Sequence, residues 1–177
     1  MSRRLGGPAT LVAALLAGYP NKAPWAPSLQ PAFGARVTDG KLQIWTGTRC
    51  AGVTRVALSF ELSGAALVLL ARSEDGVEIE HLTLGGPYPA ALDISEPLPA
   101  DFGRDQKSMS LSVHGGSGGW GTVADLDQVM KESAQHPADT YWFQDVGWLD
   151  PAVVAAQDGK AFLATCTADP AKKDNGA

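Results

Sequence analysis

The sequence has few of the features that identify a catalytic or nucleic-acid-binding protein. Only 19% of its 177 residues are charged, the formal net charge is −5, and no cluster of lysine and arginine interrupts the acidic balance. Such a surface repels phosphate backbones, so nucleic acid is excluded as an expected partner. The three histidines are too scattered to form pairs such as H-x-x-x-H, and no glycine loop has the spacing of a nucleotide-binding motif. We therefore expect no metal ion and no other cofactor.

Long hydrophobic runs are also lacking, since no segment reaches the roughly 18 consecutive apolar residues of a membrane-spanning helix. The main apolar run near the start, Leu11 to Ala17, follows Arg3 and Arg4, which is the layout of an export signal. We predict an export signal over residues 1–18 and a soluble mature protein. The alternative is a buried N-terminal helix, but the run has no amphipathic pattern and a proline-rich stretch follows it.

The end of this apolar run, Leu16-Ala17-Gly18-Tyr19, resembles the lipobox of bacterial exported lipoproteins of actinobacterial style. In a lipobox, small residues precede a cysteine that becomes lipidated, and Tyr19 occupies that position here. The resemblance covers about 19 residues and implies relatives on the cell envelope, not a lipid anchor on this chain. Cleavage after Gly18 would release the protein, whereas an uncleaved signal would hold it at the membrane.

The remaining chain has the length of a single domain with a sizeable core. Residues 19–33 contain four prolines and no periodicity, which indicates an extended tether. We predict one globular domain over 34–166 and a disordered tail over 167–177.

Only two cysteines are present, Cys50 and Cys166, 116 positions apart. In an exported protein two cysteines favour a disulfide over a metal site or a nucleophile. Closing a loop of this size stabilises the fold by about 4 to 5 kcal/mol in the chain-entropy model. The alternative is a pair of unrelated free thiols.

Alternating apolar and polar residues predict several antiparallel strands. Asp39-Gly40 between two such segments predicts a hairpin over 36–45, and the alternation continues over 54–62. A second hairpin is predicted from 66–72 and 77–84. Within it the phase slips near Glu80-His81, which indicates a bulge or burial on both faces.

Later segments add two helices. Thr122 with Asp125 resembles a capping box ahead of an apolar stripe, and Asp150-Pro151 opens a second helix that ends at Gly159. A crossing over 85–106 with one edge strand, a strand over 108–114 and a closing strand over 161–166 complete the pattern. The fold class is α+β: a mainly antiparallel β-sheet, sandwich-like or half-barrel, with two C-terminal helices packed on it.

Two patterns match hydrolase chemistry. Residues 115–119 read G-x-S-x-G, which would make Ser117 a nucleophile, but a run of glycines matches that motif by composition and holds a nucleophile poorly. Glu78 and Glu80 lie on one strand face at a separation compatible with a glycosidase pair of about 5 to 9.5 Å. Alternating glutamates on a wet strand face are nevertheless common, so both remain weak catalytic candidates.

Aromatic residues are concentrated near the end of the chain, where Tyr141, Trp142 and Trp148 follow Trp120. We expect these residues to belong mainly to the core, with one face of their segment packed on the helices and the other on the sheet. Any tryptophan that the core leaves uncovered would bind a ligand.

The leading hypothesis is therefore an exported, non-enzymatic envelope or secreted domain that binds a surface polymer or protein. A small secreted hydrolase of esterase or glycosidase type and a phage-exclusion or immunity-type surface protein are the rivals. The sequence leaves the oligomeric state open.

Overall fold

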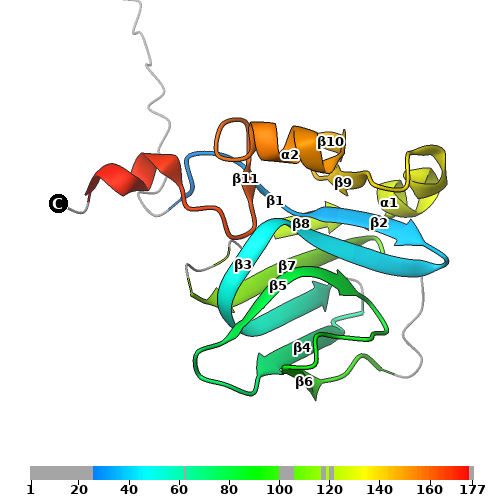
Figure 1. Ribbon diagram of the computed structural model, residues 1–177. Helices are drawn as coiled ribbons and strands as arrows, with labels where there is room; N and C mark the ends of the chain where they lie inside the picture. The colour runs from blue at the N-terminus through cyan, green and yellow to red at the C-terminus, as the bar shows by residue number, and fades with distance from the viewer. Residues whose placement is uncertain (1–25, 62, 100–105, 117–118, 120–121, 176–177) are drawn as a thin grey trace, which may run out of the picture.

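The structure is a computed structural model that describes residues 26–61, 63–99, 106–116, 119 and 122–175. Within these residues it contains a nine-stranded sheet whose pairings are all antiparallel, a separate pair of short parallel strands and two seven-residue α-helices (Figure 1). The predicted antiparallel sheet with two helices is confirmed at this level, although both helices are short. The strands are β1 Pro31–Ala32, β2 Gly34–Thr38, β3 Lys41–Phe60, β4 Ala66–Ala71, β5 Val77–Thr83, β6 Leu92–Glu96, β7 Ser108–Gly115, β8 Thr122–Asp125, β9 Tyr141–Phe143, β10 Gly147–Leu149 and β11 Leu163–Ala164. The helices are α1 Leu126–Glu132 and α2 Pro151–Gln157, with 3-10 turns at Ser133–Gln135 and Pro170–Asn175.

The long strand β3 organises the sheet. Its first half pairs with β2 on one side and β5 on the other, and its second half pairs with β7 and β4. The sheet therefore has two halves that share β3, one in the order β10-β9-β2-β3-β5 and the other in the order β8-β7-β3-β4-β6. The sequence predicted two separate strands in this region, because the glycines between them interrupt the alternation.

The two predicted hairpins have different outcomes. The hairpin around Asp39-Gly40 is confirmed, and both turn residues have positive φ, at 50° and 72°. The second hairpin is wrong, because β4 and β5 do not pair with each other. They lie end to end along the same side of β3, with the turn around Gly76 between them.

The predicted irregularity near Glu80-His81 is confirmed in position. His81 pairs with Trp45 and Ile79 pairs with Cys50, so residues 46–49 of β3 face only Glu80 of β5. The extra residues are thus on the partner strand. This offset lets Ile79 and Leu82, three residues apart, both reach the core.

The predicted start of the first helix is wrong. Thr122 lies in β8, and its hydroxyl donates to the carbonyl of Pro31 instead of capping a helix. Asp125 is the N-cap of α1 and accepts a hydrogen bond from the Gln128 amide. Pairing of β8 with β7 extends over all four residues of the strand and outweighs the local capping signal. For α2, the predicted N-cap Asp150 and first residue Pro151 are confirmed.

Two hydrophobic clusters lie on opposite faces of β9. The larger fills the space between the two halves of the sheet, and Trp142 packs against it. The smaller lies beneath α2 and contains Trp45 and Phe143. Near β2 and β9 the sheet is therefore covered on both faces, and Trp45 is only 4% exposed.

The packed part of the chain extends past both predicted boundaries. Ala32 and Phe33, assigned to the tether, are buried, and β1 pairs with β11. Asp169, assigned to the tail, is buried and accepts hydrogen bonds from the backbone and hydroxyl of Ser28. The predicted export signal of residues 1–18 lies outside the described residues.

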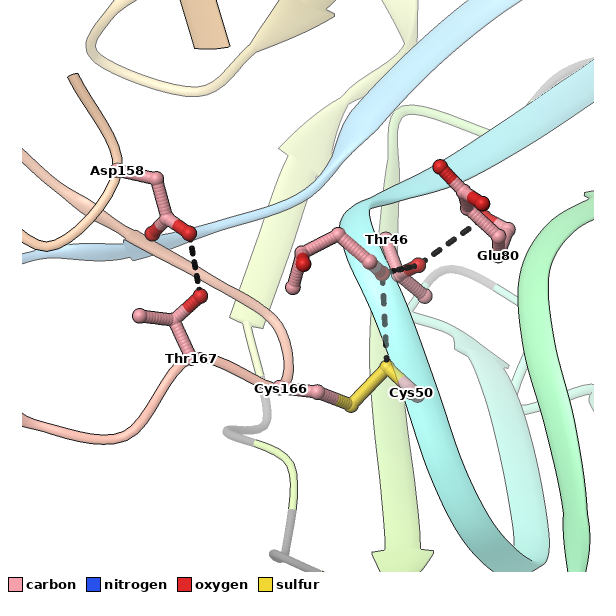
Figure 2. Close-up of a disulfide and its surroundings, with 7 residues drawn as sticks. Thr46, Cys50, Glu80, Asp158, Cys166 and Thr167 are labelled. Atoms are coloured by element: carbon pink, nitrogen blue, oxygen red, sulfur yellow. Dashed lines mark hydrogen bonds between the residues drawn. A yellow bond between two sulfur atoms is a disulfide. The ribbon is translucent and has the colours of Figure 1, made fainter. Parts of the chain in front are cut away.

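The disulfide between Cys50 and Cys166 is confirmed, with 5.4 Å between the two Cα atoms (Figure 2). It joins the middle of β3 to the residues that follow β11. Among the described residues, no helix is long and apolar enough to cross a membrane.

Candidate functional site

The segment that contains Tyr141, Trp142 and Trp148 forms a tight hairpin of β9 and β10 at one edge of the sheet. Trp148 pairs with Trp142, and the turn closes with a hydrogen bond from the Val146 amide to the Phe143 carbonyl. Asp145 has a φ of 61° in this turn. In the described part of the chain β10 pairs only with β9, which leaves its outer edge open.

One face of this hairpin carries both tryptophans. Trp148 stacks on His136, with 4.4 Å between ring centroids and 15° between ring planes, and Trp142 lies 6.1 Å from Trp148. The Trp148 indole N–H donates to Glu132 at 3.0 Å, and the same carboxylate lies 3.9 Å from His136 Nε2. All four side chains are half-buried. We name Glu132, His136, Trp142 and Trp148 the tryptophan surface.

Trp142 also belongs partly to the core. It packs against the larger hydrophobic cluster, and its buried indole N–H has no hydrogen-bond partner among the described residues. A buried unpaired donor costs about 1 to 3 kcal/mol. β9 therefore packs against a hydrophobic cluster on each face. Trp142 and Trp148 nevertheless stay partly exposed.

The opposite face of β9 contains a row of residues that crosses four strands. Phe143, Gly34, Trp45 and His81 are successive pairing partners from β9 to β5. A Cβ at Gly34 would come within 3.0 Å of both Tyr141 and Phe143, so only glycine lets the Phe143 and Trp45 rings meet, at 5.6 Å. Exposed His81 stacks on Trp45 at 5.8 Å. Half-buried Tyr141 lies 5.3 Å from Trp45 and 6.0 Å from His81.

A buried arginine supports this face. Arg36 is 4% exposed and donates hydrogen bonds to the carbonyls of Ser133, Pro137 and Thr140. These bonds hold the segment between α1 and β9 against β2. The guanidinium also lies 6.0 Å from the Tyr141 ring. Burial raises the pKa of the Tyr141 phenol, and the charge of Arg36 offsets part of that rise.

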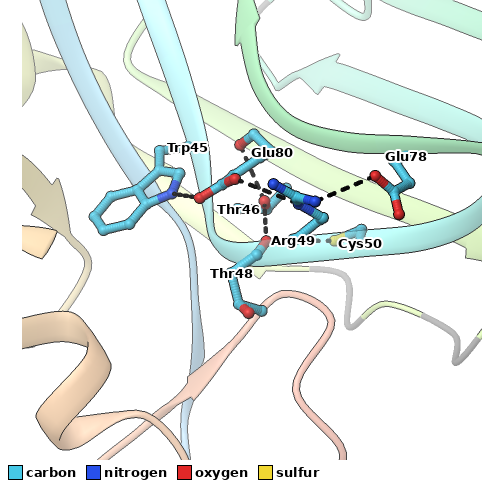
Figure 3. A network of polar contacts seen from close by, with 7 residues as sticks. All are labelled: Trp45, Thr46, Thr48, Arg49, Cys50, Glu78 and Glu80. Atoms are coloured by element: carbon cyan, nitrogen blue, oxygen red, sulfur yellow. Dashed lines mark hydrogen bonds and ion pairs between the residues drawn. The ribbon is translucent and has the colours of Figure 1, made fainter.

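Glu78 and Glu80 project from β5 next to this row and share one arginine (Figure 3). Arg49 lies 3.4 Å from Glu78 and 3.9 Å from Glu80, and the side chains of the two glutamates are 64% and 38% exposed. A glycosidase acid needs a carboxyl that stays protonated, as in an apolar pocket. Two exposed carboxylates on one guanidinium do not provide that setting.

Ser117 and Trp120 lie outside the described residues, so the structure does not place the serine of the G-x-S-x-G motif. Of the acidic and histidine side chains that follow Ser117 in the sequence, Asp125 caps α1 and His136 stacks on Trp148. Among the described residues, no group of three or more histidine, cysteine, aspartate or glutamate side chains could hold a metal ion.

Sequence reasoning identified the tryptophans, Tyr141 and the two glutamates, but it missed Trp45, His81 and Arg49 as their neighbours. These residues meet only through strand pairing, and the pattern of β3 alone contains no sign of it.

The chain matches no protein-family model, and neither a curated protein nor a solved structure is significantly similar to it.

Proposed function

We propose that the protein is an exported domain of the cell envelope or of the secreted fraction, and that it acts by binding a surface polymer or a surface protein. The Cys50–Cys166 disulfide supports the location, because such bonds persist in oxidising compartments outside the cytoplasm. The arginine-led apolar run at the start of the sequence agrees with export. The binding role depends on the tryptophan surface.

The observation that carries the proposal is the incomplete burial of Trp148 at an open sheet edge. Tryptophan is enriched among residues that dominate binding energy, particularly where its ring is held in place before the partner arrives. His136 and Glu132 hold the Trp148 ring by stacking and by a hydrogen bond. A partner that covers this edge would bury the remaining indole surface without reordering the side chain.

Co-sedimentation tests the proposal. The full chain is mixed with purified insoluble bacterial envelope polymer, and separately with immobilised envelope surface proteins, and the bound fraction is measured. Trp148→Ala should weaken binding at least tenfold, because it removes the central ring of the surface. Ile94→Ala, which truncates a 53% exposed side chain on the distant strand β6, is the matched control and should bind like the wild type. Equal binding by Trp148→Ala and Ile94→Ala, with both variants folded by circular dichroism, would contradict the proposal.

A further inference from the structure

Residues 46–49 of β3 lie opposite Glu80 and interrupt the regular pairing with β5, and we call them the excursion of β3. Several contacts hold this segment in place. The Thr46 hydroxyl lies 2.6 Å from the carbonyl of Thr48 and 3.0 Å from that of Glu80. The Thr46 carbonyl accepts from the Thr165 amide at 2.9 Å, and the disulfide fixes Cys50 at the end of the excursion. Irregular strand segments of this kind commonly redirect a side chain next to a functional site.

The side chain that the excursion presents is Arg49, placed over the two glutamates of β5 (Figure 3). Arg49 and Glu78 are largely exposed to solvent and Glu80 is partly exposed, and ion pairs in such settings contribute little to stability. The ion pairs therefore do not account for a strand interruption that is held by a disulfide and by hydrogen bonds. What the excursion achieves is to place Arg49 on the backbone where its guanidinium reaches two carboxylates.

Aromatic rings lie next to these charges. Glu80 is held from the inside as well, because the indole N–H of buried Trp45 donates to its carboxylate at 3.3 Å. Exposed His81 covers Trp45, and half-buried Tyr141 lies beside His81. The charged groups of Arg49 and Glu80 thus lie near the exposed His81 imidazole and the partly exposed Tyr141 phenol.

This arrangement selects a chemical class of ligand. A cation would meet Arg49 and an anion would meet Glu78 and Glu80, so a charged ligand gains one contact and loses another. A neutral ligand with adjacent hydroxyl groups uses both: its hydroxyls donate to carboxylates and accept from the guanidinium, while its C–H groups pack on the rings. Sugars combine these properties.

We propose that Arg49, Glu80, His81 and Tyr141 form a binding site for a neutral sugar unit, either free or within a polysaccharide. The site lies on the face of β9 opposite the tryptophan surface, since Tyr141 and Trp142 are successive residues of one strand. It is thus separate from the surface proposed above and can fail independently of it.

Isothermal titration calorimetry of the full chain tests the site. The probes are maltohexaose, cellohexaose and chitohexaose, the monosaccharides glucose and N-acetylglucosamine, and the anionic polymer hyaluronan. At least one neutral sugar should bind with a Kd of about 1 mM or tighter. Arg49→Ala and His81→Ala should each weaken that binding at least tenfold, with both variants folded by circular dichroism.

The matched control is Arg72→Ala. It removes an equally exposed arginine–carboxylate pair, that of Arg72 with Asp93 between β4 and β6, and it should not alter sugar affinity. Tighter binding of a hexasaccharide than of its monosaccharide would assign the site to a polymer, and equal binding would assign it to a free sugar. Binding of hyaluronan alone, binding of no neutral sugar, or equal affinities of Arg49→Ala and Arg72→Ala would overturn the proposal. Loss of affinity in Trp148→Ala but not in Arg49→Ala would leave the tryptophan surface standing and remove this site.

Discussion

At the scale of single residues, Asp169 shows how one carboxylate secures a segment that the sequence assigned to a disordered tail. It accepts hydrogen bonds from Ser28 and from the Ala171 amide. The Ser28 hydroxyl is the main cause of a lowered Asp169 pKa, and backbone amides add to the effect. The contact joins residues before β1 to residues after β11.

This lowered pKa gives the contact a defined pH dependence. Because the folded-state pKa lies below the unfolded value of about 3.9, the ionised carboxylate stabilises the fold above that pH, and the contribution is lost as the pH falls through the folded-state pKa. Asp169→Asn should therefore have a lower melting temperature than the wild type at pH 7, and the difference should shrink as the pH falls below about 4. Calorimetric melting at several pH values measures it, with exposed Asp139→Asn as the control. A difference that stays constant with pH would contradict the assignment.

At the scale of elements, local signals were sufficient where a few neighbouring residues decide the conformation. Asp39-Gly40 specifies its hairpin because both residues tolerate positive φ, and Asp150-Pro151 specifies the start of α2. The prediction at Thr122 was wrong because this residue pairs with β7, the preceding strand, and the capping signal in the residues that follow Thr122 does not reveal that pairing. The end-to-end placement of β4 and β5 along β3 depends on non-local pairing in the same way.

The two candidate sites differ in the same way, because one depends on residues close in sequence and the other on strand pairing. Trp142 and Trp148 were named together because they are close in sequence, and the structure places them on one hairpin. Arg49 and Glu80 were not paired in advance, because their contact needs the register offset between β3 and β5. The phase slip near Glu80-His81 indicated an irregularity in the strand, but it did not indicate that Arg49 would lie opposite it.

The start of α2 provides a test at this scale. The Asp150 side chain accepts from the Val153 amide at 2.8 Å, so Asp150→Ala should leave an unpaired amide in the first turn. The free energy of unfolding should fall by about 1 kcal/mol. Urea denaturation measures the change. Asp127→Ala, which removes an aspartate from the first turn of α1 that is not its N-cap, should cost only a few tenths of that amount. Equal effects of the two substitutions would show that charge, not capping, matters at Asp150.

At the scale of the whole molecule, the disulfide connects the middle of the long strand β3 to the residues that follow β11. Its loop spans 116 positions, so its loss should lower the free energy of unfolding by about 4 to 5 kcal/mol. The double variant Cys50→Ala/Cys166→Ala and the reduced wild type should have equal stabilities in urea, both well below that of the oxidised protein. Intact mass should rise by about two protons on reduction. A reduced protein as stable as the oxidised one would contradict this role.

The two faces of β9 also determine what a spectroscopic probe can observe. Of the tryptophans in the described residues, Trp45, Trp142 and Trp148 all lie on or next to this strand, and the described half of the sheet that contains β4 and β6 has none. The fluorescence of these three described tryptophans therefore reports on the part of the sheet that contains β9. A far-ultraviolet signal from the whole sheet, followed in parallel, would reveal whether the half built on β4 and β6 melts together with the aromatic end or after it.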